Sequence, residues 1–306
     1  MMQTCRLCPR NCGADRENGK TGYCGEYAEV RVARVSLHMW EEPCISGTNG
    51  SGTIFFSGCS LRCVFCQNKS IALGNKGETL TIKELCSVFL LLQEKNAENI
   101  NLVTPTHFVP QIVKAIELAK AKGLTLPIVY NSGSYEHIET IKMLDGLVDI
   151  YLPDLKYKSD ILSRHYSNAP DYFLHAEKAI EEMVRQTKSP VFKNGLMKSG
   201  TIVRHMILPG YTKDSKDIIC YLYEKYKDDI YISIMNQYTP PQDMEAMGFA
   251  KLSRSVTKRE YDKVIDFALD IGVVNAFIQE GETASESFIP DFDDRALLNE
   301  ILEKRS

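Results

Sequence analysis

From residue 52 onwards, short runs of β-branched and aromatic residues alternate with stretches whose apolar residues recur at helical spacing. The first run, residues 53–57, is bounded by glycines and is typical of a buried strand. Thr81 and Thr257 each stand three residues before a glutamate, which predicts a capping box at the start of a helix. The same pattern predicts further strands at residues 101–103, 126–130, 147–152, 201–207, 230–234 and 273–278.

A strand followed by a helix, repeated about six times, is the sequence form of a parallel sheet with right-handed crossover connections. The predicted fold class is therefore α/β. Periodicity leaves open whether the sheet forms a full barrel, a partial barrel or a doubly wound sheet. All three arrangements bind ligands at the carboxyl ends of their strands.

The first fifty residues have a different texture, with many cysteines, glycines and charges and little periodicity. Such a segment is predicted to be rich in loops and to need an external staple. We therefore divide the chain into a cysteine-rich segment at residues 1–50, a core at 51–285 and a helical tail at 286–306.

The overall composition narrows the classes of protein. With 306 residues, 44% hydrophobic and 25% charged, the chain is typical of a globular protein with a full core. A formal net charge of -4 supplies no basic field for phosphate, so nucleic-acid binding is not indicated. The longest apolar run, residues 88–92, is too short for a membrane span, and no signal peptide is evident. We expect a cytoplasmic protein without a membrane partner.

Ten cysteines in such a chain point to metal rather than to disulfides, because cytosolic thiols stay reduced. Cys59, Cys63 and Cys66 follow the first predicted strand directly, with the spacing C-x3-C-x2-C. Three thiolates hold three irons of a cubane cluster and leave the fourth iron open, which is typical of a catalytic metal site. The alternative is a zinc site completed by a cysteine from the first fifty residues.

This loop, with the aromatic Phe65 just before its last cysteine, resembles the signature of the radical S-adenosylmethionine (radical SAM) superfamily. The resemblance implies a partial (β/α)6 barrel. The chain is also similar to pyruvate formate-lyase activating enzyme-like proteins through residues 154–156, Arg204 and residues 208–210. A fuller set of motifs resembles an uncharacterised subgroup of that family, at residues 5–13, 41–47, 104–107 and 236–238.

The resemblance implies an enzyme that binds a [4Fe-4S] cluster and S-adenosylmethionine. Reductive cleavage of S-adenosylmethionine then gives a 5′-deoxyadenosyl radical that abstracts hydrogen from a substrate. The reaction implied is installation of a glycyl radical in a partner protein, with a flavodoxin or ferredoxin as reductant. Two alternatives remain: radical modification of another macromolecule or metabolite, and a non-catalytic iron–sulfur or zinc interaction protein.

The residues that the resemblance assigns to S-adenosylmethionine follow the ends of successive predicted strands. They are Phe65, Thr104, Thr106, Asn131, Ser132, Asp154, Lys156 and Arg204. Several have structural alternatives: Phe65 suits the core, Thr106 a helix N-cap, and Arg204 an internal salt bridge, while Asp154 and Lys156 can pair with each other.

The loop that usually holds the methionyl amine in this family is rich in glycine and acid. Here it reads Thr104-Pro105-Thr106-His107, so hydroxyl groups are the candidate acceptors. The histidines form no zinc motif, and His107 is expected at the surface or at a helix end.

Four cysteines of the N-terminal segment form a second set, Cys5, Cys8, Cys12 and Cys24. Four thiolates over twenty residues suit a structural zinc or a second, fully ligated iron–sulfur cluster. The spacing does not choose between these metals, and free thiols are the third possibility. Cys44 is either a further ligand or a bystander.

Overall fold

The computed structural model describes residues 4–279 and 291–305, and in that part of the chain the strands form one sheet of ten. The order is β10-β9-β8-β6-β5-β4-β2-β1-β3, with β7 paired to β8. The strands are β1 (Val30–His38), β2 (Ser51–Phe56), β3 (Glu78–Leu80), β4 (Ile100–Val103), β5 (Ile128–Ser132), β6 (Ile150–Pro153), β7 (Val191–Lys193), β8 (Leu196–Met206), β9 (Tyr231–Met235) and β10 (Ala276–Ile278).

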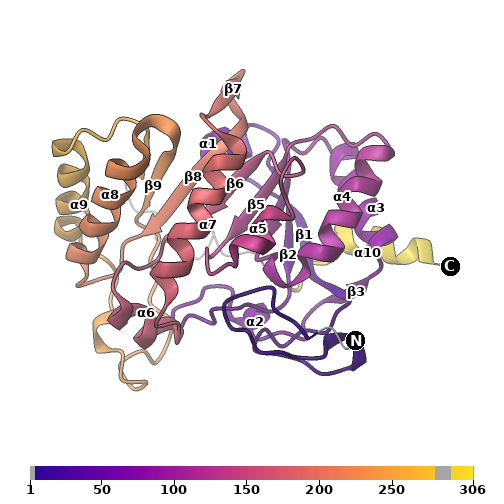
Figure 1. The fold of residues 1–306 in the computed structure, drawn as a ribbon, viewed down its shortest axis with the longest axis horizontal. Coiled ribbons are helices and arrows are strands. Elements are labelled where there is room, and N and C mark those ends of the chain that lie inside the picture. Colours follow the sequence, from indigo (N-terminus) through magenta and orange to yellow (C-terminus); the bar gives the residue numbers. More distant parts are fainter. Residues whose placement is uncertain (1–3, 280–290, 306) are drawn as a thin grey trace.

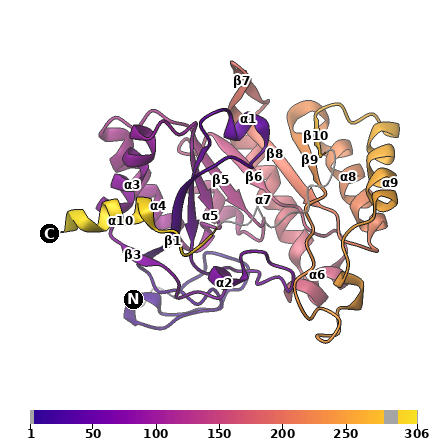
Figure 2. The ribbon, with the colours of Figure 1, turned by 180° about the vertical axis from the view of Figure 1, so that it is seen from behind.

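The α-helices mostly connect these strands. They are α1 (Pro43–Ser46), α2 (Lys69–Ala72), α3 (Ile82–Glu94), α4 (Val109–Ala121), α5 (Ile138–Lys142), α6 (Asp160–Ser167), α7 (Tyr172–Thr187), α8 (Thr212–Tyr226), α9 (Lys258–Asp270) and α10 (Ala296–Leu302). Figures 1 and 2 show that most of the longer helices lie on one side of the sheet.

The run from β2 to β10 is parallel along the sheet, and β1, β3 and β7 pair antiparallel with their neighbours. This confirms the predicted α/β class. Within the described residues the sheet does not close, because β10 and β3 are its edges. An open, mostly parallel sheet is compatible with the partial barrel that the sequence implied.

Local signals in the sequence account for several elements. Both predicted capping boxes form: the Thr81 and Thr257 hydroxyls accept the backbone N–H of Glu84 and Glu260, and each glutamate accepts in return. Cys86 on α3 is fully buried in the main apolar cluster. These contacts fix where α3 and α9 begin.

One part of the N-terminal segment is not a loop. Residues 30–38 form β1, which pairs with β2 through six residue pairs and carries β3 on its other side. The loop-rich stretch is therefore shorter than predicted and ends at residue 29. At the other end of the chain, α10 packs Leu298 and Ile301 into the main cluster. The division at residues 50 and 285 stays a prediction.

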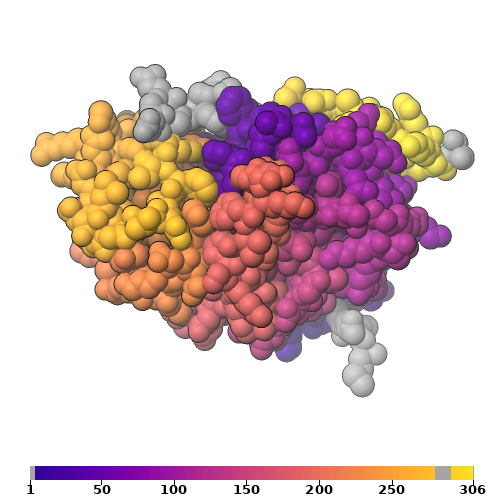
Figure 3. Space-filling view, turned by 90° about the horizontal axis from the view of Figure 1, so that it is seen from above, coloured from indigo at the N-terminus to yellow at the C-terminus, as the bar shows by residue number. Residues whose placement is uncertain are grey.

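The loops at the carboxyl ends of the strands lie at one end of the molecule, where α2, α6 and the N-terminal segment gather in Figure 1. At the opposite end, Figure 3 shows the β7–β8 hairpin beside the segment around α1. No helix in the described ranges is long and apolar enough to cross a bilayer.

Candidate functional site

A cavity of about 680 Å³ opens at the carboxyl ends of the parallel strands. A volume of that size is in the range of sites for small molecules and cofactors. Its wall includes all three cysteines of the C-x3-C-x2-C loop and all eight residues that the sequence assigned to S-adenosylmethionine. These are Cys59, Cys63, Cys66, Phe65, Thr104, Thr106, Asn131, Ser132, Asp154, Lys156 and Arg204.

The cysteine loop begins where β2 ends, at Gly58. Gly58 has a φ of 84°, and a Cβ there would lie 2.6 Å from the carbonyl oxygen of Cys24, so only glycine fits. Within the loop, the Cys66 N–H donates to the carbonyl of Cys63 at 3.1 Å. The Ser167 hydroxyl, at the end of α6, donates to Cys63 Sγ at 2.9 Å.

The donor set of this loop fits a thiolate-bound cluster. Burial and the charges of Cys59 and Cys63 raise the pKa of Cys66 to about 12, so the apo thiol is protonated. Binding of iron therefore has to displace protons, as for other thiolate sites. In residues 4–279 and 291–305, no three Cys, His, Asp or Glu side chains come together around a single-ion site. A four-iron cluster, however, keeps its cysteine sulfurs farther apart than one ion does.

Phe65 lies between the cysteine loop and an aromatic wall. It is 4% exposed and packs edge-to-face against Tyr157, Tyr166 and Tyr238, with ring centroids 6.2–6.4 Å apart. Phe65 is therefore a core residue, which is one of the two alternatives that the sequence offered, and it also lines the cavity. Its contact with S-adenosylmethionine stays a prediction. This wall keeps water away from one side of the cysteine loop.

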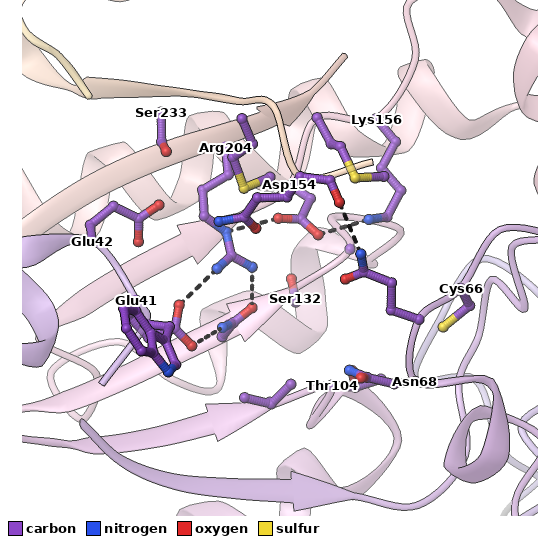
Figure 4. A pocket seen from close by; sticks show the side chains of 18 of the residues that line it. Glu41, Glu42, Cys66, Asn68, Thr104, Ser132, Asp154, Lys156, Arg204 and Ser233 are labelled. Atoms are coloured by element: carbon purple, nitrogen blue, oxygen red, sulfur yellow. Dashed lines mark hydrogen bonds and ion pairs between the residues drawn. The ribbon is translucent and has the colours of Figure 1, made fainter. Parts of the chain in front are cut away.

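Arg204, on β8, is the centre of an ion-pair network that spans four elements (Figure 4). Its guanidinium donates to Asp154 at 2.9 Å, to Glu41 at 2.9 Å and to Asn131 at 2.6 Å. All three of its nitrogens are thus engaged by the protein, which is the internal salt bridge that the sequence offered as an alternative. Glu41 had no predicted role, because it lies before β2 and only tertiary structure brings it here.

Asp154 and Lys156 pair with each other, which is the structural alternative that the sequence offered. The ammonium of Lys156 lies 2.7 Å from Asp154 Oδ2. Although burial opposes it, Arg204 and Lys156 hold the pKa of Asp154 below its usual value. With Glu41 and Arg204, this pair makes a network of two carboxylates and two cations, which is neutral as a unit.

Thr104 and Thr106 lie on the loop after β4, beside the cysteine loop. The neighbouring His107 holds this loop in place, because its Nε2 donates to the carbonyl of Ser57 at 2.6 Å. Ser57 lies two residues before Cys59. His107 lies just before α4, as expected of a helix-end residue, but it is buried. Thr104 has a φ of 58°, a strained value for a β-branched residue and one that marks many functional loops.

Sequence reasoning missed Glu136, which sits against Thr106. The Thr106 hydroxyl donates to Glu136 Oε1 at 2.8 Å, so Thr106 does not act as a helix N-cap. The Tyr130 hydroxyl lies 3.4 Å from both carboxylate oxygens. Glu136 lines the cavity but is 1% exposed, and burial raises its pKa to about 7. It forms no ion pair with any residue in the described ranges.

The other end of the cavity lies between α1 and β9. Glu42 and Ser233 lie there, on the opposite side of Arg204 from Cys66 (Figure 4). Burial and the charge of Glu41 raise the pKa of Glu42, against the effect of Arg204. Ser132, by contrast, uses its hydroxyl locally to accept the Ser134 N–H at 3.2 Å.

The second cysteine set lies outside the cavity wall but near the cysteine loop. Cys5, Cys8, Cys12 and Cys24 are close enough that the charges of Cys24 and Cys5 act on Cys8, and those of Cys5 and Cys12 act on Cys24. Cys44 is elsewhere, buried on α1 in a small apolar cluster with Ile45. Metal binding by the C-x3-C-x2-C loop and by this second cysteine set stays a prediction.

A three-thiol loop at the carboxyl edge of a parallel sheet, facing a cavity of cofactor size, defines a class of enzyme that pairs a metal cluster with an organic cofactor. Residues 53–222 of the chain match the Radical SAM superfamily. The chain therefore belongs to the radical SAM superfamily, whose members are enzymes that use a [4Fe-4S] cluster and S-adenosylmethionine.

Other proteins resemble the chain in sequence or in fold. The chain is 25% identical over 279 residues to the uncharacterized protein MJ0674 of Methanocaldococcus jannaschii, covering 88% of this chain and 75% of that protein. Its fold resembles a radical SAM methyltransferase from Sphaerobacter thermophilus, with a TM-score of 0.53 and 13% identity over 78% of this chain and 69% of the other. It also resembles Streptococcus suis SuiB bound to S-adenosylmethionine, with a TM-score of 0.51 and 11% identity over 77% of this chain and 52% of SuiB.

Proposed function

We propose that this chain cleaves S-adenosylmethionine reductively at a [4Fe-4S] cluster held by Cys59, Cys63 and Cys66. The observation that carries the proposal is the convergence of these cysteines and eight strand-end residues on one cavity. When bound, the reduced cluster supplies the electron that breaks the sulfonium carbon–sulfur bond, giving methionine and a 5′-deoxyadenosyl radical. The protein's own residues bind and orient the reactants and exclude water.

The methionyl amine needs a carboxylate that no cation of the protein already holds. Asp154 and Glu41 are engaged by Arg204, and Asp154 also by Lys156. Glu42 lies on the opposite side of Arg204 from Cys66, away from the cysteine loop. Glu136 lines the same cavity, is paired only with hydroxyls and lies beside the cysteine loop through Thr106. We infer that Glu136 accepts a hydrogen bond from this amine, in the place of the acid that the loop after β4 lacks.

The remaining roles follow from what each side chain offers. Phe65 and its aromatic wall supply an apolar surface that keeps water from the radical's path. Asn131 and Ser132 present polar atoms at the end of β5 for ribose or carboxylate oxygens. Lys156 lies close enough to Cys63 for the Cys63 charge to raise the pKa of Lys156. The Lys156 cation favours binding of anionic groups beside the cysteine loop.

For the substrate, we propose a protein segment that carries a glycine, in keeping with the resemblance to glycyl-radical activating enzymes. Two large apolar side chains at the rim of the cavity support a macromolecular substrate: Trp40 is 55% exposed and Met39 is 45% exposed. Exposed apolar surface beside a site is typical of an interaction surface. The reductant is then a flavodoxin or ferredoxin.

The test is anaerobic reconstitution with iron and sulfide, followed by incubation with dithionite and S-adenosylmethionine. We expect 5′-deoxyadenosine from the wild-type chain and none from Cys63→Ala. Turnover that persists unchanged in Cys63→Ala contradicts the site assignment. For the substrate, electron paramagnetic resonance (EPR) of a candidate partner distinguishes a glycyl radical from modification of another macromolecule or metabolite, where no such radical forms.

A further inference from the structure

The N-terminal segment places four thiols near one another without building a core of its own, although within the described ranges no three of them surround a single-ion site. The Cys5 N–H donates to the carbonyl of Ala14 at 2.9 Å, and the Gly13 N–H donates back to Cys5 at 3.2 Å, so the chain forms a small loop that contains Cys8 and Cys12. Gly22, two residues before Cys24, packs directly against Cys12, because a Cβ at Gly22 would lie 2.4 Å from Cys12 Sγ. This close approach brings Cys24 towards the other three cysteines.

The segment has few elements of its own and is held largely by contacts of Arg16, which is buried and donates to the carbonyls of Glu26, Tyr27 and His107. Residues 4–29 contain one short helical turn, Arg16–Asn18, and no strand. Pro9 and Cys24 are buried, whereas Tyr27 is 38% exposed. A polar segment of this kind gains its folding free energy from a bound metal when thiolates are available to hold one.

Arg10, between Cys8 and Cys12, ties the segment to the cluster-binding part of the enzyme. Its guanidinium donates to the carbonyls of Ser60 at 2.7 Å and Leu61 at 3.4 Å, both inside the C-x3-C-x2-C loop. The same side chain stacks over the ring of Tyr23 at 3.9 Å. A planar fork of donors is suited to several acceptors at once, and a lysine is not.

The other half of the guanidinium reaches the end of α6. It donates to the carbonyls of Ser167 at 2.9 Å and Asn168 at 2.5 Å. Ser167 is the residue whose hydroxyl donates to Cys63 Sγ. Arg10 therefore holds both the cysteine loop and the serine that hydrogen-bonds one of its cysteines. A second contact adds to this, since Gly58 packs against the carbonyl of Cys24.

We propose that Cys5, Cys8, Cys12 and Cys24 bind a metal centre of their own, and that this centre fixes Arg10 so that Arg10 positions the loop of Cys59, Cys63 and Cys66. The ligand class is a tetrathiolate metal, either zinc or a second iron–sulfur cluster. The first half stands independently of the proposed function. The second half rests on it, because it needs a cluster on the C-x3-C-x2-C loop.

The metal half is tested by metal analysis of the full chain with Cys59, Cys63 and Cys66 all changed to serine. We expect about one zinc or about four irons per chain to remain. Cys12→Ser in that background should release most of that metal, and because Cys12 is exposed it is the substitution least harmful to folding. A triple-serine chain that is folded by circular dichroism yet carries no metal overturns the metal half.

The positioning half is tested by Arg10→Lys in the otherwise unchanged chain, with Arg6→Lys as the matched control. Arg6 is next to Cys5, is exposed and makes no hydrogen bond within the described ranges. We expect Arg10→Lys to keep its circular dichroism spectrum and its N-terminal metal but to change the EPR signal of the reduced cluster, while Arg6→Lys keeps the wild-type signal. An unchanged signal in Arg10→Lys overturns the positioning half. A wild-type chain that assembles no cluster on the loop overturns the proposed function instead.

Discussion

The Glu136→Gln variant tests separately how the buried carboxyl group affects the stability of the fold and how it affects binding of S-adenosylmethionine. The pKa of Glu136 is raised by burial from 4.5 to about 7, which corresponds to about 3 kcal/mol. A raised pKa means that the folded chain holds this proton more tightly than the unfolded chain. Stability is therefore undiminished below pH 4.5 and falls as the pH rises to 7. Glutamine has nearly the same shape and no charge, so we expect the variant to be more stable than wild type by up to about 3 kcal/mol at pH 8 and equal at pH 4.5.

Binding of S-adenosylmethionine should change in the opposite direction. A charge-assisted hydrogen bond to a buried partner contributes about 1.5–3 kcal/mol, so Glu136→Gln should weaken binding roughly 10- to 150-fold at pH 7.5. Below pH 7 the wild-type carboxyl must lose its proton to accept the hydrogen bond from the amine. Wild-type affinity should therefore fall about tenfold for each unit by which the pH is lowered below 7, whereas the affinity of the variant should not depend on pH in this way.

The assay is anaerobic calorimetry with the oxidised, reconstituted protein, in which no cleavage occurs. The matched ligands are S-adenosylhomocysteine and its analogue without the amino group. Removal of the amino group should weaken binding to wild type more than binding to Glu136→Gln. Glu139→Gln, an exposed change three residues away on α5, is the control and should match wild type. If Glu136→Gln binds both ligands like wild type, the assignment of Glu136 as the acceptor for the amine is wrong.

Three further predictions concern the residues around the cluster. Ser167→Ala removes the hydrogen bond to Cys63 and should lower the cluster's reduction potential by roughly 40 mV, equivalent to about 1 kcal/mol for one electron, in a redox titration monitored by EPR. Arg204→Gln leaves Glu41 without its cation and Asp154 with Lys156 alone, and it should cost about 3–5 kcal/mol in urea unfolding. A smaller loss in a Glu41→Gln/Arg204→Gln double variant supports the network, and an equal loss argues against it. Gly22→Ala should cut the N-terminal metal content, because its Cβ would overlap Cys12 Sγ, and full metal content would refute that placement.

Much of the fold was predictable because strands and helices carry local signals. The two capping boxes and the parallel strands from residue 51 onwards lie close to where the periodicity put them. The exception is β1, whose residues 30–38 alternate apolar and polar side chains but lie in a cysteine-rich context. Its pairing with β2 across the intervening residues is a tertiary contact that no local pattern encodes.

The site was predictable where chemistry follows a strand end directly, as with Cys59, Asp154 and Lys156. It was not predictable where partners come from different elements. Glu136 lies in an unremarkable loop, and only the fold brings it to Thr106. Arg204 looked equally suited to a cofactor carboxylate and to an internal salt bridge, because the sequence did not reveal that Glu41 lies 2.9 Å away.

The most direct measurement is the EPR spectrum of the dithionite-reduced, reconstituted chain before and after S-adenosylmethionine is added. A cubane bound by three cysteines has one iron open to the amino and carboxylate groups of the added molecule. We predict a [4Fe-4S] signal that shifts on addition, with no such signal when Cys66 is changed to alanine in a chain that also lacks the N-terminal cysteines. A cluster signal indifferent to S-adenosylmethionine, or a chain that loads zinc alone, would contradict the account.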